Sequence, residues 1–256
     1  MTLKLGSKGE DVKTLQMKLD IDVDGDFGTQ TREAVKEFQR THNLVVDGVV
    51  GDKTWILLMD NIIYDPLKVH ITRLPNRKID YIVIHFTAGT TSHPGKAKTV
   101  KKVFEQRQAS ADFCVDDRDI IQFNPSIKDY YCWAVGDSLK TSTSGGKYHS
   151  LATNKNTINI EICSNCTPPT AQGIAYPNHS GWIFSEESLN NTIRLVKLLM
   201  NRYNIDKEHV IRHYDVTGKS CPGIIGWNDE DIINIDGKKA GEKGNSNQWK
   251  KFKANL

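Results

Sequence analysis

The stretch Tyr81-Ile82-Val83-Ile84-His85 is an apolar run, rich in β-branched residues, that ends in a histidine. This composition is typical of a strand buried in a sheet, and the turn-forming Thr87-Ala88-Gly89 follows it closely. Open α/β sheets place their ligands at the carboxyl ends of central strands. The stretch therefore predicts an α/β fold and makes His85 a candidate ligand at that edge of the sheet.

A second stretch, residues 213–223 (HYDVTGKSCPG), offers an imidazole and a thiol within one turn-rich loop. The strand-like Val210-Ile211-Arg212 leads into His213, and the glycines and proline around Cys221 indicate that the chain folds back. Together with His85, these two residues would give three protein ligands and leave a fourth position open, as in catalytic zinc sites. We therefore predict Zn²⁺ as the cofactor, with His85, His213 and Cys221 as its ligands.

Residues 157–163 alternate isoleucine with polar residues or cysteine, a pattern that predicts a strand. Because a carboxylate on an inner strand is costly unless it is paired or faces a polar cavity, Glu161 is a candidate catalytic base. A structural salt bridge is the alternative role for this side chain. Lys219, two residues before Cys221, is expected beside the metal, with its ammonium directed at a developing oxyanion.

The chain resembles the zinc-dependent N-acetylmuramoyl-L-alanine amidases, the family that includes peptidoglycan recognition proteins, in three motifs: residues 84–89 (IHFTAG), 158–161 (INIE) and 212–222 (RHYDVTGKSCP). The resemblance covers roughly residues 68–227. It implies a mixed central β-sheet flanked by helices. It also implies hydrolysis of the amide bond between N-acetylmuramic acid and L-alanine in bacterial peptidoglycan by a zinc-activated water, with Glu161 as the base, causing cell-wall lysis.

One departure from the family pattern precedes the next predicted strand. Some phage members carry a tyrosine and a histidine just before a phenylalanine, where this chain has Ala111 and Asp112 before Phe113. This difference leaves more of the proton transfer to Glu161. Two alternatives share the fold: a non-catalytic peptidoglycan-binding protein, and a regulator that binds another protein. Cys221 favours the enzyme, because the non-catalytic members lack the third ligand.

The N-terminal stretch contains an internal repeat. An Asp-Gly-x-x-Gly turn occurs at residues 24–28 and again at 47–51, and each turn precedes a segment with helical spacing of apolar residues. An earlier helix is marked by apolar residues between Val12 and Leu19, so we expect a small all-α unit of three helices. The opening from Leu3 to Gln16 resembles the three-helix peptidoglycan-binding domain. A spacer without a ligand of its own is the alternative.

These patterns predict a division into three segments: a peptidoglycan-binding domain at 1–61, a linker and domain entry at 62–79, and a zinc amidase domain at 80–256. Within the last segment we expect a helix at about 186–203 with Ser185 as its N-cap. Residues 138–156 have no apolar periodicity and indicate a long surface loop. The lysine-rich stretch after Gly237 predicts a weakly ordered basic tail.

The composition of the 256-residue chain, 38% hydrophobic and 25% charged, is ordinary for a globular protein. The net charge of +3 is too small to argue for a nucleic-acid partner. Residues 1–8 lack the apolar region of a secretory signal, and no apolar run is long enough to cross a bilayer. We therefore expect synthesis in the cytoplasm, action on the wall after release, and no stable membrane association.

The five cysteines are expected to be reduced thiols, because the chain shows no export signal. Cys163 and Cys166 form a closely spaced pair, which is typical of metal and redox sites, but no second such pair exists. Cys163 also suits the end of a buried strand. The pair is therefore left without an assigned role.

Overall fold

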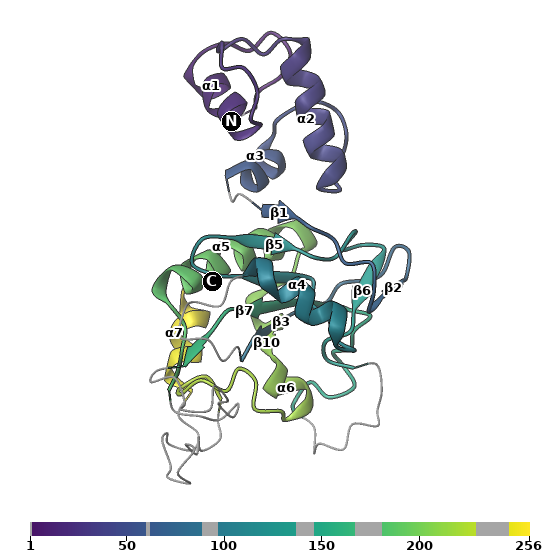
Figure 1. Cartoon of the computed structure of the whole chain (residues 1–256), viewed down its shortest axis with the longest axis vertical. Coiled ribbons are helices and arrows are strands. Elements are labelled where there is room, and N and C mark those ends of the chain that lie inside the picture. The colour runs from purple at the N-terminus through teal and green to yellow at the C-terminus, as the bar shows by residue number, and fades with distance from the viewer. Residues whose placement is uncertain (1, 60–61, 89–96, 137–145, 167–180, 229–245) are drawn as a thin grey trace. The chain divides into compact units, whose positions relative to one another are not determined.

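The computed structural model describes residues 2–59, 62–88, 97–136, 146–166, 181–228 and 246–256 (Figure 1). The chain forms two compact units, unit 1 at Met1–Tyr64 and unit 2 at Asp65–Leu256. The first boundary therefore falls three residues after the predicted end of the N-terminal domain at Asn61. Among the helices described, none combines the length and apolar character needed to cross a membrane.

Unit 1 contains three helices, as the sequence predicts: α1 (Glu10–Lys18), α2 (Thr29–Thr41) and α3 (Asp52–Met59). A short strand, β1 (Ile62–Tyr64), follows them. The core of the unit consists of buried apolar side chains from the helices and from the turns between them: Leu3, Val12, Leu15, Phe27, Val35, Val50 and Leu58. Unit 1 thus buries a hydrophobic core of its own.

Each half of the internal repeat holds a buried glutamine whose amide binds the turn that follows. Gln16 donates from Nε2 to Asp24 Oδ1 at 2.6 Å, and its Oε1 accepts from the backbone N–H of Gly25 at 2.8 Å. The second half repeats both bonds, with Gln39 bound to Asp47 Oδ1 at 2.8 Å and to the N–H of Gly48 at 2.8 Å. The turn glycines have φ of +76° and +71°, which disfavours any residue with a Cβ. The repeat in sequence is therefore a repeat in structure.

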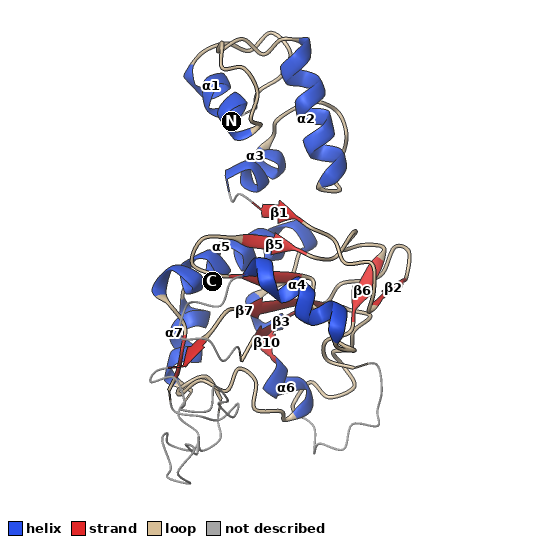
Figure 2. Cartoon of the chain, in the orientation of Figure 1, coloured by secondary structure: helices blue, strands red, loops and turns tan. Residues whose placement is uncertain are grey.

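Unit 2 is built on a mixed sheet in which described strands lie in the order β5-β4-β7-β3-β10 (Figure 2). Their bounds are β3 Tyr81–Phe86, β4 Phe113–Val115, β5 Ile120–Gln122, β7 Thr157–Ile162 and β10 Val210–Arg212. Neighbours from β4 to β10 are parallel, whereas β5 is antiparallel to β4. The α/β prediction with a mixed central sheet is confirmed, and β3 is its buried inner strand.

Two helices flank this sheet, α4 (Ala97–Gln106) and α5 (Glu186–Tyr203) (Figure 2). The predicted N-cap of α5 is correct, because Ser185 accepts a hydrogen bond from the backbone N–H of Ser188. The remaining elements are short: β2 Ile71–Arg73, β6 Tyr130–Cys132, β8 Asn165–Cys166, β9 Trp182–Ile183, the 3₁₀ helix Lys207–His209, α6 His213–Thr217 and α7 Asn247–Ala254.

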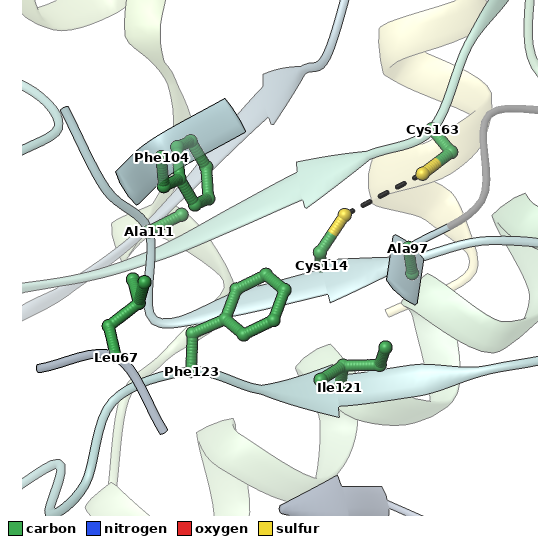
Figure 3. Close-up of a cluster of buried hydrophobic side chains, with 8 residues drawn as sticks. All are labelled: Leu67, Ala97, Phe104, Ala111, Cys114, Ile121, Phe123 and Cys163. Carbon is green, nitrogen blue, oxygen red and sulfur yellow. Dashed lines mark hydrogen bonds between the residues drawn. The ribbon is translucent and has the colours of Figure 1, made fainter. Parts of the chain in front are cut away.

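The cluster between α4 and the sheet is apolar (Figure 3). Its buried members are Leu67, Ala97, Phe104, Ala111, Cys114, Ile121, Phe123 and Cys163. The Sγ atoms of Cys114 and Cys163 lie 3.6 Å apart, and both residues are free thiols. Cys163 therefore packs in the core at the end of a strand, in the environment that the sequence favoured for it.

The predicted linker at 62–79 differs from the structure, since residues 65–79 belong to unit 2. Strand β2 pairs with β6 in antiparallel fashion, and the side chain of Arg77 is completely buried. Its Nε donates to the carbonyl of Ile127 at 2.6 Å and its Nη1 to that of Thr157 at 2.9 Å. Prolines and weak periodicity suggested a linker here, but pairing and buried hydrogen bonds tie this segment to the sheet.

The predicted weakly ordered tail is wrong at its end, where residues 247–254 form helix α7. Trp249 and Phe252 are buried, and their rings lie 5.8 Å and 5.2 Å from the ring of Trp227. Aromatic packing thus orders a segment whose lysines suggested solvation. The rest of the predicted tail, up to residue 245, lies outside the described residues, as do residues 138–145 of the predicted surface loop.

Candidate metal centre

His85 lies near the carboxyl end of β3, between β7 and β10. All three strands are parallel, so their carboxyl ends meet at one edge of the sheet. The register pairs His85 with Glu161 on β7 and Ile84 with Arg212 on β10. This topology brings the predicted site residues from three distant parts of the sequence to the same edge.

His213 is the first residue of α6, directly after β10. The turn into α6 is fixed by Arg212, whose Nη2 and Nε donate to the carboxylate of Asp215 at 2.6 Å and 2.9 Å. The loop then returns, and the backbone N–H of Tyr214 donates to the carbonyl of Cys221 at 2.9 Å. This closure confirms the predicted fold-back and sets the thiol beside the imidazole.

The structure brings the three predicted metal ligands together. One donor atom from each of His85, His213 and Cys221 lies within 4.8 Å of the other two, and all three residues are buried. The two imidazole rings have centroids 4.6 Å apart, and Cys221 Sγ lies 3.9 Å from His85 Nδ1. Two imidazole nitrogens and a sulfur are the donors that zinc prefers, and three protein ligands leave a position for water or substrate.

Burial shapes the protonation of these ligands. It lowers the pKa of His85 to about 4, partly opposed by a hydrogen bond to Asn159, and it places the pKa of His213 well below 6.5. Both imidazoles are therefore neutral at pH 7, the form that binds a metal. Burial also raises the pKa of the Cys221 thiol to about 12. In the absence of a cation the centre thus holds no net charge on these three side chains.

Glu161 retains some exposure, but its Oε2 atom is buried without a hydrogen-bond partner among the described residues. Burial raises the pKa of this carboxyl to about 7, and the positive charge of Lys219 opposes the shift. No ion pair of Glu161 occurs in the described part of the chain, so the salt-bridge alternative has no support there. A carboxyl that titrates near neutral pH can both accept and return a proton.

A cavity of about 450 Å³ opens over the centre. Its lining includes His85, Glu161, His213, Lys219 and Cys221, so all the predicted site residues face one space. The ammonium of Lys219 has no hydrogen-bond or ion-pair partner in the described chain. Helix α4 and Trp133, which is 40% exposed, supply an apolar wall of this cavity.

Two residues near the centre were not assigned a role from the sequence. Asn159 is completely buried, and its Oδ1 lies 3.0 Å from His85 Nε2. Asp112, noted only as a departure from the family pattern, does not line the cavity; its carboxylate accepts hydrogen bonds from Arg77 and Asn124. A role for Asn159 could have been inferred from the sequence, because it is a polar residue on a predicted inner strand, two positions before Glu161.

Family models match both units. Residues 75–224 match the N-acetylmuramoyl-L-alanine amidase model, and residues 8–58 match a peptidoglycan binding domain model. The first match contains every predicted site residue. The second contains the glutamine repeat and all of α2.

Individual relatives match parts of the chain. N-acetylmuramoyl-L-alanine amidase XlyA of Bacillus subtilis (strain 168) is 28% identical over 193 residues, 74% of this chain and 54% of that protein. The zinc D-Ala-D-Ala carboxypeptidase of Streptomyces albus G is 37% identical over 62 residues, 21% of this chain and 24% of that protein. The chain thus spans about half or less of the length of these curated relatives.

A solved structure, the catalytic domain of XlyA, aligns with 24% identity and a TM-score of 0.49, covering 76% of this chain and 98% of that one. Because the amidase model alone covers residues 75–224 of the 256, more than half of the chain, the protein belongs to the N-acetylmuramoyl-L-alanine amidase family.

Proposed function

We propose that the protein hydrolyses the amide bond between N-acetylmuramic acid and L-alanine in bacterial peptidoglycan, with zinc held by His85, His213 and Cys221. One observation carries the proposal: two imidazoles and a thiol lie within 4.8 Å of one another, in a cavity that also takes Glu161 and Lys219. Family membership supplies the substrate, which the donor atoms alone would not identify.

The donor set fits a catalytic zinc. When bound, zinc supplies Lewis-acid polarisation of the scissile carbonyl and lowers the pKa of water toward neutrality. The neutral rings of His85 and His213 offer their lone pairs without first losing a proton. Cys221 would bind as a thiolate, because a divalent cation next to the sulfur outweighs the burial that raises the thiol pKa.

Glu161 is the proposed general base. Its buried Oε2 is free to accept the proton of the attacking water and then to return it to the leaving amine nitrogen. The pKa of about 7 matches this double role at neutral pH, and a cation nearby would shift the carboxyl further toward its ionised form. Proton transfer by a positioned side chain typically contributes about a hundredfold to ten-thousandfold in rate.

Lys219 is the proposed partner of the oxyanion. It lines the same cavity as Glu161 and the three metal ligands. Its ammonium would stabilise the negative charge that develops on the carbonyl oxygen as the water attacks. Because this charge is absent from the bound substrate, the contact favours the transition state over the ground state.

Unit 1 is proposed to bind peptidoglycan and so to hold the catalytic unit on the cell wall. The match of residues 8–58 to the peptidoglycan binding domain model supports this role. A net charge of +3 does not oppose approach to an anionic wall. The proposed site of action is therefore the cell wall, with lysis as the result.

Mass spectrometry of digested peptidoglycan tests the proposal. Purified cell walls incubated with the zinc-loaded protein should release peptide stems with a free L-alanine amino group, without new reducing sugar ends. Cys221→Ser, whose hydroxyl is a poor zinc donor, should release almost none. Wall binding without any stem release would support the non-catalytic alternative. New reducing ends without free stems would overturn the proposed bond.

A further inference from the structure

The two ring nitrogens of His85 have different neighbours, Asn159 and Cys221. Nε2 lies 3.0 Å from Asn159 Oδ1, while Nδ1 is the atom 3.9 Å from Cys221 Sγ. An amide oxygen only accepts hydrogen bonds, so Nε2 must carry the proton in this contact. The lone pair of the neutral ring is then on Nδ1, and it points to the metal centre.

The orientation of the Asn159 amide is fixed by its other end. Nδ2 donates to Thr157 Oγ1 at 3.0 Å and to Asp112 Oδ2 at 3.3 Å. The hydroxyl of Thr157 itself donates to the carbonyl of Thr153 at 2.8 Å, so it meets Asn159 with a lone pair. A flipped amide would set its oxygen against a carboxylate and its NH₂ against Nε2–H.

Besides Asn159 Nδ2, three further donors hold the carboxylate of Asp112. Its Oδ2 accepts from the backbone N–H of Asn159 at 2.7 Å, and its Oδ1 accepts from Asn124 Nδ2 at 2.6 Å and from Arg77 Nη2 at 3.4 Å. The side chains of Arg77 and Asp112 are both fully buried. Arg77 donates its remaining hydrogen bonds to backbone carbonyls. The network leaves the carboxylate little freedom to turn.

We propose that Asn159 is a positioning residue, which fixes the ring plane and the tautomer of His85 so that Nδ1 is presented to the metal. Asp112 and Arg77 would act through Asn159 by holding its amide. The inference rests on the proposed zinc role of His85. It follows the general rule that the second nitrogen of a ligating histidine is bound by an acceptor, which orients the ring.

Two substitutions at this position separate positioning from stability. Asn159→Ala removes the acceptor. Asn159→Asp keeps an acceptor oxygen for His85 Nε2 but sets a second carboxylate against Asp112, which destabilises the fold. Zinc affinity of the metal-free protein is measured by competition with a chromogenic chelator, and the midpoint of thermal unfolding is measured on the same samples.

The two measurements should rank the variants in opposite orders. Asn159→Ala should bind zinc about tenfold to a hundredfold more weakly than the wild type, the usual loss for such a partner. Asn159→Asp should unfold at the lower temperature yet bind zinc more tightly than Asn159→Ala. Zinc affinities that simply follow the unfolding temperatures would reduce Asn159 to a structural role and overturn the inference.

Asn191→Ala is the matched control. Asn191 lies on helix α5, and its buried amide donates to the carbonyl of Asp116 at 2.9 Å, without contact to the metal centre. It should lose stability but keep the zinc affinity of the wild type, and this comparison decides the case if Asn159→Asp does not fold. A wild-type protein that fails to bind zinc would instead reject the proposed metal, which is a distinct result from equal affinities.

Discussion

Burial of the Glu161 carboxyl favours its neutral form when no cation is present. Its pKa is about 7 in the folded protein, against an ordinary value of 4.5. The fold therefore binds a proton that the unfolded chain releases between these two values. The stability that this proton confers is complete below pH 4.5 and is lost as the pH rises through 7.

The metal-free protein should show this linkage in urea unfolding. Glu161→Gln keeps the size of the side chain and removes the titration, so it should gain stability over the wild type by about 2–3 kcal/mol more at pH 8 than at pH 5. The figure allows for the partial exposure of the carboxyl. An equal difference at the two pH values would mean that Glu161 is not perturbed by burial.

Lys219 should matter to turnover and not to the metal. Lys219→Ala should lower kcat by roughly a hundredfold to a thousandfold, because it removes the proposed oxyanion partner, with little change in KM. Zinc content, measured by atomic absorption, should stay at the wild-type level. Lys155→Ala, an exposed lysine before the start of β7, serves as the control and should leave kcat unchanged. Loss of zinc from Lys219→Ala would point to a collapsed loop instead.

The candidate ligands could be predicted from the sequence because His85 and His213 come at the carboxyl ends of strand-like runs and Cys221 comes next to Pro222 in a turn-rich loop. The residues that support them could not. Arg77 and Asp112 are 35 positions apart in the chain, and Asp112 and Asn159 are 47 apart. Their pairing depends on strand order and register, which local patterns do not contain. Arg77 was hidden further, because prolines around it suggested a linker.

The glutamine repeat of unit 1 shows how much one side chain can hold in a small element. Gln39→Ala would leave the buried N–H of Gly48 without its acceptor, a loss of about 1–3 kcal/mol. Hydrogen exchange of the full chain should show faster exchange across unit 1. Gln30→Ala, on the exposed side of the same helix, should leave the exchange rates as they are. Equal effects of the two variants would remove the structural role of the repeat.

Helix α7 marks a limit of local prediction at the level of elements. Its lysines indicated solvated chain, yet Trp249 and Phe252 are three positions apart and share one face of a helix. The guanidinium carbon of Arg212 lies 5.4 Å from the centre of the Trp249 ring, so α7 also packs near the first residue of α6. The spacing of these two aromatic residues can be read from the sequence, whereas their contact with Trp227 cannot.

At the scale of the whole molecule, each unit has a core of its own, so unit 2 should fold and bind zinc without unit 1. A variant lacking residues 1–64 should cleave a soluble muramoyl-peptide at the wild-type rate and sediment much less with purified cell walls. The separate unit 1 should still sediment with the walls. Unchanged sedimentation of the shortened variant would favour the spacer alternative for unit 1.

Unit 1 contains both halves of the sequence repeat, but the residue at which unit 2 begins depends on contacts that the sequence pattern does not reveal. Residues 65–79 look irregular by composition, and they join unit 2 through β2 and Arg77. A shortened variant that begins after Arg77 would leave Asp112 buried without its guanidinium, which is typically costly. The choice of starting residue therefore decides whether the shortened protein folds.

The buried cysteines can be used to detect local opening of the folded protein. Cys114, Cys132 and Cys163 are all at most 4% exposed and lie outside the lining of the cavity over the metal centre, and burial raises the pKa of the Cys114 and Cys132 thiols. A bulky maleimide can reach these sulfurs only when the surrounding structure opens. The time course of alkylation therefore counts opening events one cysteine at a time, and peptide mapping of the attached label would tell which part of the sheet opens first.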